Sequence, residues 1–246
     1  ERVSRLLLES QHAHGRGDAA GAAARIAKVR EGLNSLGDKA ARLFPQAEAT
    51  VAAMHADIET QLRPAVLQAI ASHDARAMLE HAPTCRALGF DALLSECYVQ
   101  CRQGPVFEGW NRSARGLGGG ADASNASVVS GSLHRFWAMI EETAASEVAW
   151  LDVALQPEAP ALLPQMLVEA LNTLSQPICS ALSSVLEGED APQDVLDALQ
   201  GAWDKARDVA AKVCALLEKQ AADAAANAAD GGGTGGLGDG GGGGGG

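Results

Sequence analysis

Apolar residues recur every three or four positions along most of the chain, and this spacing predicts amphipathic helices. The clearest pattern spans residues 150–186, with apolar residues at Leu163, Leu167, Ala170, Leu174, Ile178, Ala181 and Val185. Pro177 lies inside this pattern and removes a hydrogen bond to the carbonyl of Thr173, so we expect a kink there. A long helix with one apolar face needs partners along its length, and the flanking segments are the expected partners.

Similar patterns predict helices in the first half of the chain. Residues 1–21 hold a short helical segment that ends in a glycine-containing break. Residues 22–36 and 38–71 predict an antiparallel helix pair, and Pro64 is expected to bend or restart the second helix. Shorter helices are expected beyond this pair: one from Asp74 to a stop at Pro83, one after Gly89, and one that begins at Gly104-Pro105.

The second half of the chain contains a predicted loop, two further helices and a tail. Residues 116–131 are small and polar and predict a flexible loop, with Ser132 as the N-cap of the next helix. The last helix follows Asp190 and carries a seam with alternating spacings of three and four, which is typical of coiled coils. We expect a partner to bind along this seam, at Leu199, Ala206, Val209, Val213 and Leu216.

The composition favours an all-α fold, because alanine and leucine dominate and the pair Val128-Val129 is the one hint of a strand. We predict an elongated helical rod of stacked antiparallel helix bundles. Its two parts are residues 22–115 and 132–229, joined by the loop at 116–131. Residues 230–246 are almost all glycine and predict a disordered tail.

The net charge of −12 argues against a nucleic-acid partner, because binding phosphates requires clustered Lys and Arg. No apolar run approaches the roughly 18–20 residues that span a bilayer, and no signal-peptide pattern begins the chain. The number of cysteines is odd, and they are scattered, which favours free thiols in a reducing compartment over disulfides. They are Cys85, Cys97, Cys101, Cys179 and Cys214.

The sequence offers little that resembles a catalytic site. Cys97 and Cys101 are one helical turn apart, but a zinc site needs two more ligands, so a buried thiol pair is the favoured interpretation. Glu141 and Glu142 are adjacent and are interpreted as a solvated face rather than an acid/base pair. The glycines at 116–120 have neither a preceding strand nor a following Lys-Ser or Lys-Thr, so they do not predict a phosphate site. We therefore predict a protein that is not an enzyme and has no cofactor or metal.

Two blocks of the sequence carry a recognisable order of residues. In the first, 73–111, an arginine–leucine segment leads to a helix with tyrosine and cysteine three apart and then to a tryptophan: Arg86, Leu88, Tyr98, Cys101 and Trp110. In the second, 132–182, a tryptophan precedes two prolines and a leucine: Trp150, Pro157, Pro164 and Leu167. Over about residues 25–217, this order resembles the family of the seventh subunit of the conserved oligomeric Golgi complex.

The resemblance implies a subunit of a cytosolic vesicle tether, peripheral to the cytoplasmic face of Golgi membranes and built of helical rods. Its implied role is intra-Golgi retrograde transport, protein transport and Golgi organisation. Its implied partners are the other subunits of the complex, SNARE fusion proteins and small GTPases. Members of this family are much longer, and this chain begins with Glu1 rather than Met, so we expect a fragment or a shortened form.

Two alternatives remain open at this point: a subunit of another rod-shaped tether, such as the exocyst, or a helical enzyme with an unrecognised site. A pocket with converging polar groups and displaced pKa values would favour the enzyme. Long exposed apolar surfaces on the helices would favour the scaffold.

Overall fold

The computed structural model describes residues 1–115, 126–156, 159–186 and 193–230. Within these ranges the regular elements are ten α-helices, with no strand. The all-α prediction is therefore confirmed for the described part of the chain. The glycine-rich tail predicted at 230–246 lies outside the described residues from position 231 onward.

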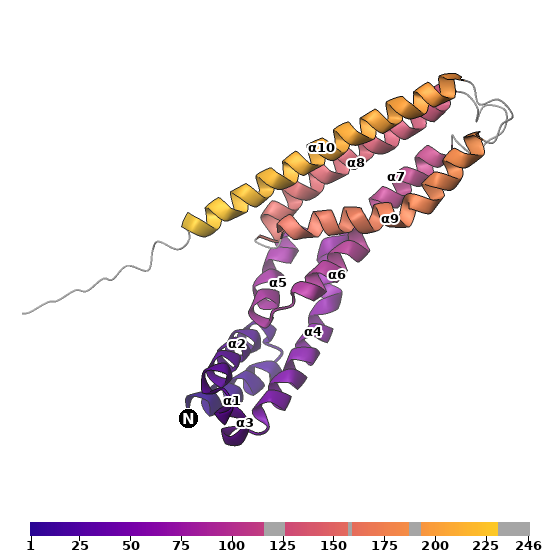
Figure 1. Cartoon of the computed structure of the whole chain (residues 1–246). Coiled ribbons are helices and arrows are strands. Elements are labelled where there is room, and N and C mark those ends of the chain that lie inside the picture. Colours follow the sequence, from indigo (N-terminus) through magenta and orange to yellow (C-terminus); the bar gives the residue numbers. More distant parts are fainter. Residues whose placement is uncertain (116–125, 157–158, 187–192, 231–246) are drawn as a thin grey trace, which may run out of the picture.

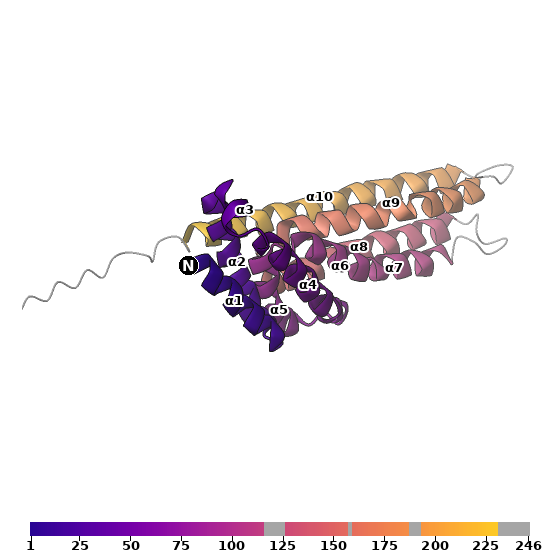
Figure 2. The same ribbon diagram turned by 90° about the horizontal axis from the view of Figure 1, so that it is seen from below.

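The helices form two arms that meet at an angle (Figure 1). The lower arm comprises α1 Arg2–Gly15, α2 Ala19–Leu36, α3 Lys39–Leu43, α4 Ala47–Ala71, α5 Ala75–Leu88 and α6 Asp91–Arg102. The upper arm comprises α7 Gly104–Ala114, α8 Ala126–Ala154, α9 Ala159–Leu186 and α10 Gln193–Asp230. The view from below shows α7 to α10 extending away together from the lower arm (Figure 2).

Local signals in the sequence account for several helix ends of the lower arm. The Asp74 carboxylate accepts a hydrogen bond from the backbone N–H of Ala77 at 3.0 Å and caps the start of α5. Gly89 ends α5 with a φ of 70°, a left-handed conformation that glycine adopts without steric cost. The predicted starts at Asp74 and after Gly89 are thus confirmed.

Two predicted helix boundaries in this arm, at Pro83 and at Pro45, are wrong. Pro83 does not stop α5, which continues through it to Leu88 and lacks only the hydrogen bond that the missing N–H would have made to the carbonyl of Leu79. At Pro64, where a bend or a restart is expected, α4 does not restart but continues to Ala71. Conversely, the helix expected to run through Pro45 divides there into α3 and α4, since Phe44 leaves the helical conformation.

The predicted loop at 116–131 is also too long. The helix α8 begins at Ala126, so Ser132 lies inside it and is buried rather than acting as an N-cap. Val129, from the pair that hinted at a strand, is buried in the same helix. Burial of Val129 against the core overrides its preference for strands, because intrinsic propensities are weak beside tertiary packing. Residues 116–125 lie outside the described residues.

The upper arm is built around α8, α9 and α10. In Figure 1, α9 changes direction part-way along its length, as expected of a helix that contains internal prolines, here Pro164 and Pro177. Its predicted apolar stripe is the buried face of the helix, with Leu163, Leu167, Ala170 and Leu174 all buried.

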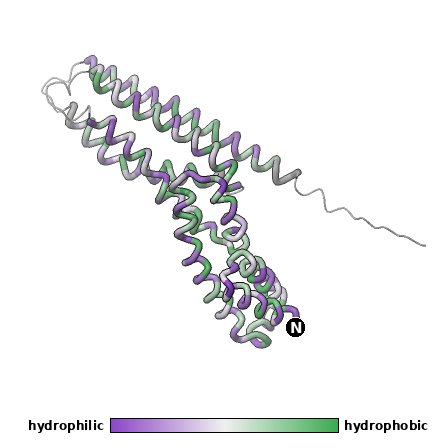
Figure 3. The backbone as a smooth tube through the Cα atoms, turned by 180° about the vertical axis from the view of Figure 1, so that it is seen from behind, coloured by the Kyte–Doolittle hydropathy of each residue, from purple (hydrophilic) through white to green (hydrophobic). Residues whose placement is uncertain are grey.

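Hydrophobic and hydrophilic residues alternate along the helices of both arms (Figure 3). The apolar sides form one continuous core, which runs from the lower arm through the junction into the upper arm. Its largest fully buried side chains include Ile58, Leu94, Tyr98, Phe136, Leu151 and Leu163. None of the described helices combines the length and apolar character needed to cross a bilayer.

Candidate functional site

The predicted binding seam on α10 lies largely against α8. Val209 and Val213 are only 1% and 8% exposed, so α8 already covers them. Ala206, Leu199 and Leu216 are half-buried at the edges of the same contact. The two valines are therefore covered within the isolated chain, and a partner could reach them only if α10 left its neighbouring helices. Partner binding along this seam stays a prediction.

Polar contacts define how α8 and α10 align. Glu141 of α8 pairs with two lysines of α10: Lys205 Nζ lies 3.4 Å from Oε2, and Lys212 Nζ lies 2.9 Å from Oε1. Further along, the amide of Gln220 donates to Asp152 Oδ1 at 2.8 Å. Since the residue numbers rise together on both helices, α8 and α10 run parallel. Hydrogen bonds from Lys212 chiefly lower the pKa of Glu141, which is thus an ion-pairing residue rather than simply a solvated one.

Beside the buried seam, α10 carries apolar residues that α8 does not cover. Leu196 is 45% exposed, and Trp203, one heptad later, is 63% exposed. Ala210, a further heptad on, is exposed too. We call Leu196, Trp203 and Ala210 the apolar strip of α10. The spacing of apolar residues does not by itself separate this strip from the seam, because the two lie on adjacent sides of one broad apolar face.

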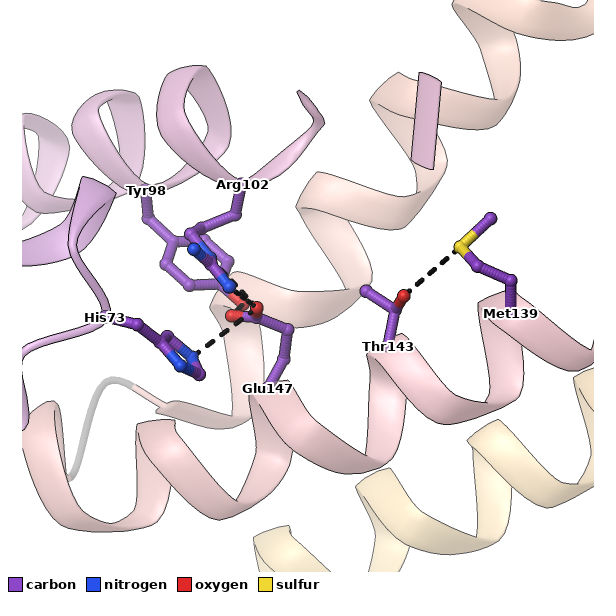
Figure 4. Close-up of polar contacts among 6 residues, drawn as sticks. All are labelled: His73, Tyr98, Arg102, Met139, Thr143 and Glu147. Atoms are coloured by element: carbon purple, nitrogen blue, oxygen red, sulfur yellow. Dashed lines mark hydrogen bonds and ion pairs between the residues drawn. The ribbon is translucent and has the colours of Figure 1, made fainter. Parts of the chain in front are cut away.

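A buried carboxylate lies where the two arms meet. Glu147 of α8 is 1% exposed, and its charge is compensated from α6 (Figure 4). The Tyr98 hydroxyl donates to Oε2 at 2.8 Å, and Arg102 Nε donates to Oε1 at 2.9 Å. A second nitrogen of the Arg102 guanidinium also donates to Oε1. We call Glu147, Tyr98, Arg102 and His73 the Glu147 centre.

His73 completes this centre from the turn between α4 and α5. Its Nε2 lies 3.6 Å from Glu147 Oε1, too far for a hydrogen bond. The backbone of His73 has a φ of 56°, which is rare for a residue other than glycine. Its ring stacks on Trp150, with ring centroids 5.1 Å apart and planes 18° from parallel. Packing on Trp150 thus holds the His73 ring close to the carboxylate.

Burial displaces the pKa values of two members of the centre. The pKa of Tyr98 is raised, first by burial and then by the neighbouring Glu147 charge. The pKa of His73 is lowered, first by burial and then by the Arg102 charge, which together outweigh the attraction of Glu147. At neutral pH, His73 is therefore uncharged, and the ion pair is the one between Glu147 and Arg102.

The geometry of the Glu147 centre favours a structural role. Glu147 is buried and bonded on both carboxylate oxygens, so it has little freedom to transfer a proton. Two surface cavities, of about 450 and 520 Å³, are lined by other residues. A sequence signal for this site existed: Glu147 falls within the apolar stripe of α8, and Tyr98 and Arg102 share one face of α6.

The predicted thiol pair is placed as expected on α6. Cys97 is buried and Cys101 is half-buried. Burial raises the pKa of the Cys97 thiol to about 11. Within the described ranges, no three or more His, Cys, Asp or Glu side chains are grouped so that they could hold a metal ion.

Neither the scan against protein-family models nor the comparisons with curated proteins and with solved structures found a match for this chain.

Proposed function

We propose that this chain is a non-enzymatic scaffold subunit of a vesicle tether of the Golgi type. In this proposal it works at the cytoplasmic face of Golgi membranes without spanning them, and it supports intra-Golgi retrograde transport. The order of residues in the two blocks at 73–111 and 132–182 supports the choice of family. The helix-only architecture is compatible with the helical rods that this family implies, although α8 and α10 run parallel rather than antiparallel.

The observation that carries the proposal is the apolar strip of α10. An exposed tryptophan on the same side of a long helix as an exposed leucine two turns away is unusual for a surface that contacts only water. Tryptophan is also among the residues that contribute most to binding at protein interfaces. The strip therefore replaces the buried seam as the proposed docking face.

The spacing of the strip favours a helix as its occupant. Leu196 and Trp203 are one heptad apart, with the half-buried Leu199 between them. This is the arrangement into which the apolar side chains of a second helix pack in a coiled coil. We propose that the occupant is an amphipathic helix of a sibling subunit. SNARE proteins and small GTPases are further proposed partners, on the basis of the family resemblance alone.

The test is co-purification of the chain with sibling subunits from extract, followed by mass spectrometry. The variant Leu196→Ala with Trp203→Ala should weaken sibling binding by about tenfold or more, since buried tryptophans commonly contribute at least about 2 kcal/mol to an interface. Its melting temperature should stay close to that of the parent, because both side chains are exposed.

The matched control is Leu8→Ala, another exposed leucine, on α1 in the lower arm. It should leave both sibling binding and melting unchanged. Undiminished sibling binding by the α10 variant would contradict the docking face. Capture of exocyst subunits in place of Golgi tether subunits would contradict the proposed family and favour the other tether.

A further inference from the structure

The Glu147 centre connects the two arms. Glu147 and Trp150 belong to α8 of the upper arm, whereas Tyr98 and Arg102 belong to α6 of the lower arm. His73 comes from the turn between α4 and α5 and approaches from the lower arm as well. Every hydrogen bond to Glu147 described above therefore crosses the junction (Figure 4).

The chain passes from one arm to the other next to this centre. Within the described residues, the crossing is at Gln103, a single residue between α6 and α7. Pro105 interrupts the helix there, because it has no N–H to donate to the carbonyl of Cys101. The residue before Gln103 is Arg102, the partner of Glu147. The break between α6 and α7 and the ion pair across the junction are thus neighbours in sequence.

We propose that the Glu147 centre is a latch that sets the angle between the two arms, with Gln103 as the hinge. This inference does not depend on the proposed tether function, because it rests on the geometry of the junction alone.

Apolar contacts at the junction are poorly suited to fixing an angle. The core continues through the junction, but the hydrophobic effect depends on the area buried and has no preferred direction of its own. The contact between Ser95 Oγ and Gln165 Oε1, at 2.6 Å, also crosses from α6 to α9, but it is exposed and water competes for it. Hydrogen bonds to a buried carboxylate are directional and shielded, so they select one orientation.

The angle can be followed through the distance between two spin labels, one on each arm. Cys214 on α10 is exposed and takes one label. The substitution Ala53→Cys adds the other at an exposed position of α4. Cys101→Ala and Cys179→Ser remove the other accessible thiols. Pulsed electron paramagnetic resonance then gives the distribution of distances between the arms.

The test variant is Glu147→Met with Arg102→Met in the labelled chain. Replacing both partners leaves no unpaired buried charge, so this variant avoids the unfolding expected from a single replacement. We expect its distance distribution to be at least twofold wider than that of the parent, with the helical circular dichroism signal retained. The matched control is Glu141→Gln, which disrupts ion pairs of α8 inside the upper arm and should leave the distribution narrow.

Three outcomes would overturn the proposal. A distribution as narrow as that of the parent would show that apolar packing alone sets the angle. Equal broadening in Glu141→Gln would assign the effect to general loosening of α8. Loss of the helical signal in the double methionine variant, and also in the polar double variant Glu147→Gln with Arg102→Gln, would show that the centre holds the fold as a whole rather than the angle.

Discussion

Replacing Val213 with aspartate tests whether α10 is part of the core or a separate docking element. Val213 lies in the seam against α8 and is 8% exposed. The sequence pattern alone allows this residue to bind a partner while the isolated chain stays folded. The structure predicts instead that the isolated chain is destabilised.

Two contributions set the size of this effect. Removing a buried valine side chain from its apolar contacts costs about 1.5–3 kcal/mol. Placing a carboxylate in the same position without a partner adds about 1–3 kcal/mol, even after the helix adjusts. The sum is roughly 2.5–6 kcal/mol, a large part of the ~5–15 kcal/mol that stabilises a typical folded protein. For a chain of this size, it corresponds to a drop in melting temperature of roughly 10 °C.

The neighbouring residue supplies the control. Cys214 is exposed on the same helix, so Cys214→Asp adds the same charge one position along without entering the core. It should change stability by less than about 0.5 kcal/mol. The buried Leu174→Asp in α9 should destabilise as strongly as Val213→Asp. Thermal and urea unfolding of the three variants provide the measurements. Equal stability of Val213→Asp and Cys214→Asp would refute the packing of α10 on α8.

Two further predictions concern titratable groups. The pKa of His73 is lower in the folded chain than in the unfolded chain, so the unfolded chain binds a proton at a higher pH. The free energy of unfolding should therefore fall as the pH drops below about 6.5. In His73→Gln, the free energy of unfolding in urea should fall less between pH 8 and pH 5 than it does in the parent. An equal fall in the variant and the parent would contradict the assignment to His73. The buried Cys97 thiol, with its pKa raised to about 11, should resist a thiol reagent at pH 8 in the native chain, whereas the exposed Cys214 should react rapidly. Mass spectrometry after brief labelling identifies which cysteine is modified, and early modification of Cys97 would place it at the surface.

The sequence determined the features that depend on near neighbours. The helical periodicity is one, since residues three and four apart lie on one side of any helix. The cap at Asp74 and the turn at Gly89 are others, because a side-chain oxygen or a missing Cβ acts within a few residues. The break at Gly104-Pro105 likewise follows from the chemistry of a single residue.

Only the tertiary structure decided which apolar positions are buried and which polar groups meet. On α10, Val209 and Trp203 belong to the same broad apolar face, but the placement of α8 buries the first and leaves the second exposed. Glu147 and Arg102 are 45 residues apart, and neither has a local signal that identifies the other. Contacts of this kind depend on how whole helices pack against one another. That packing depends on the side chains of all the helices involved and cannot be read from one segment of the sequence.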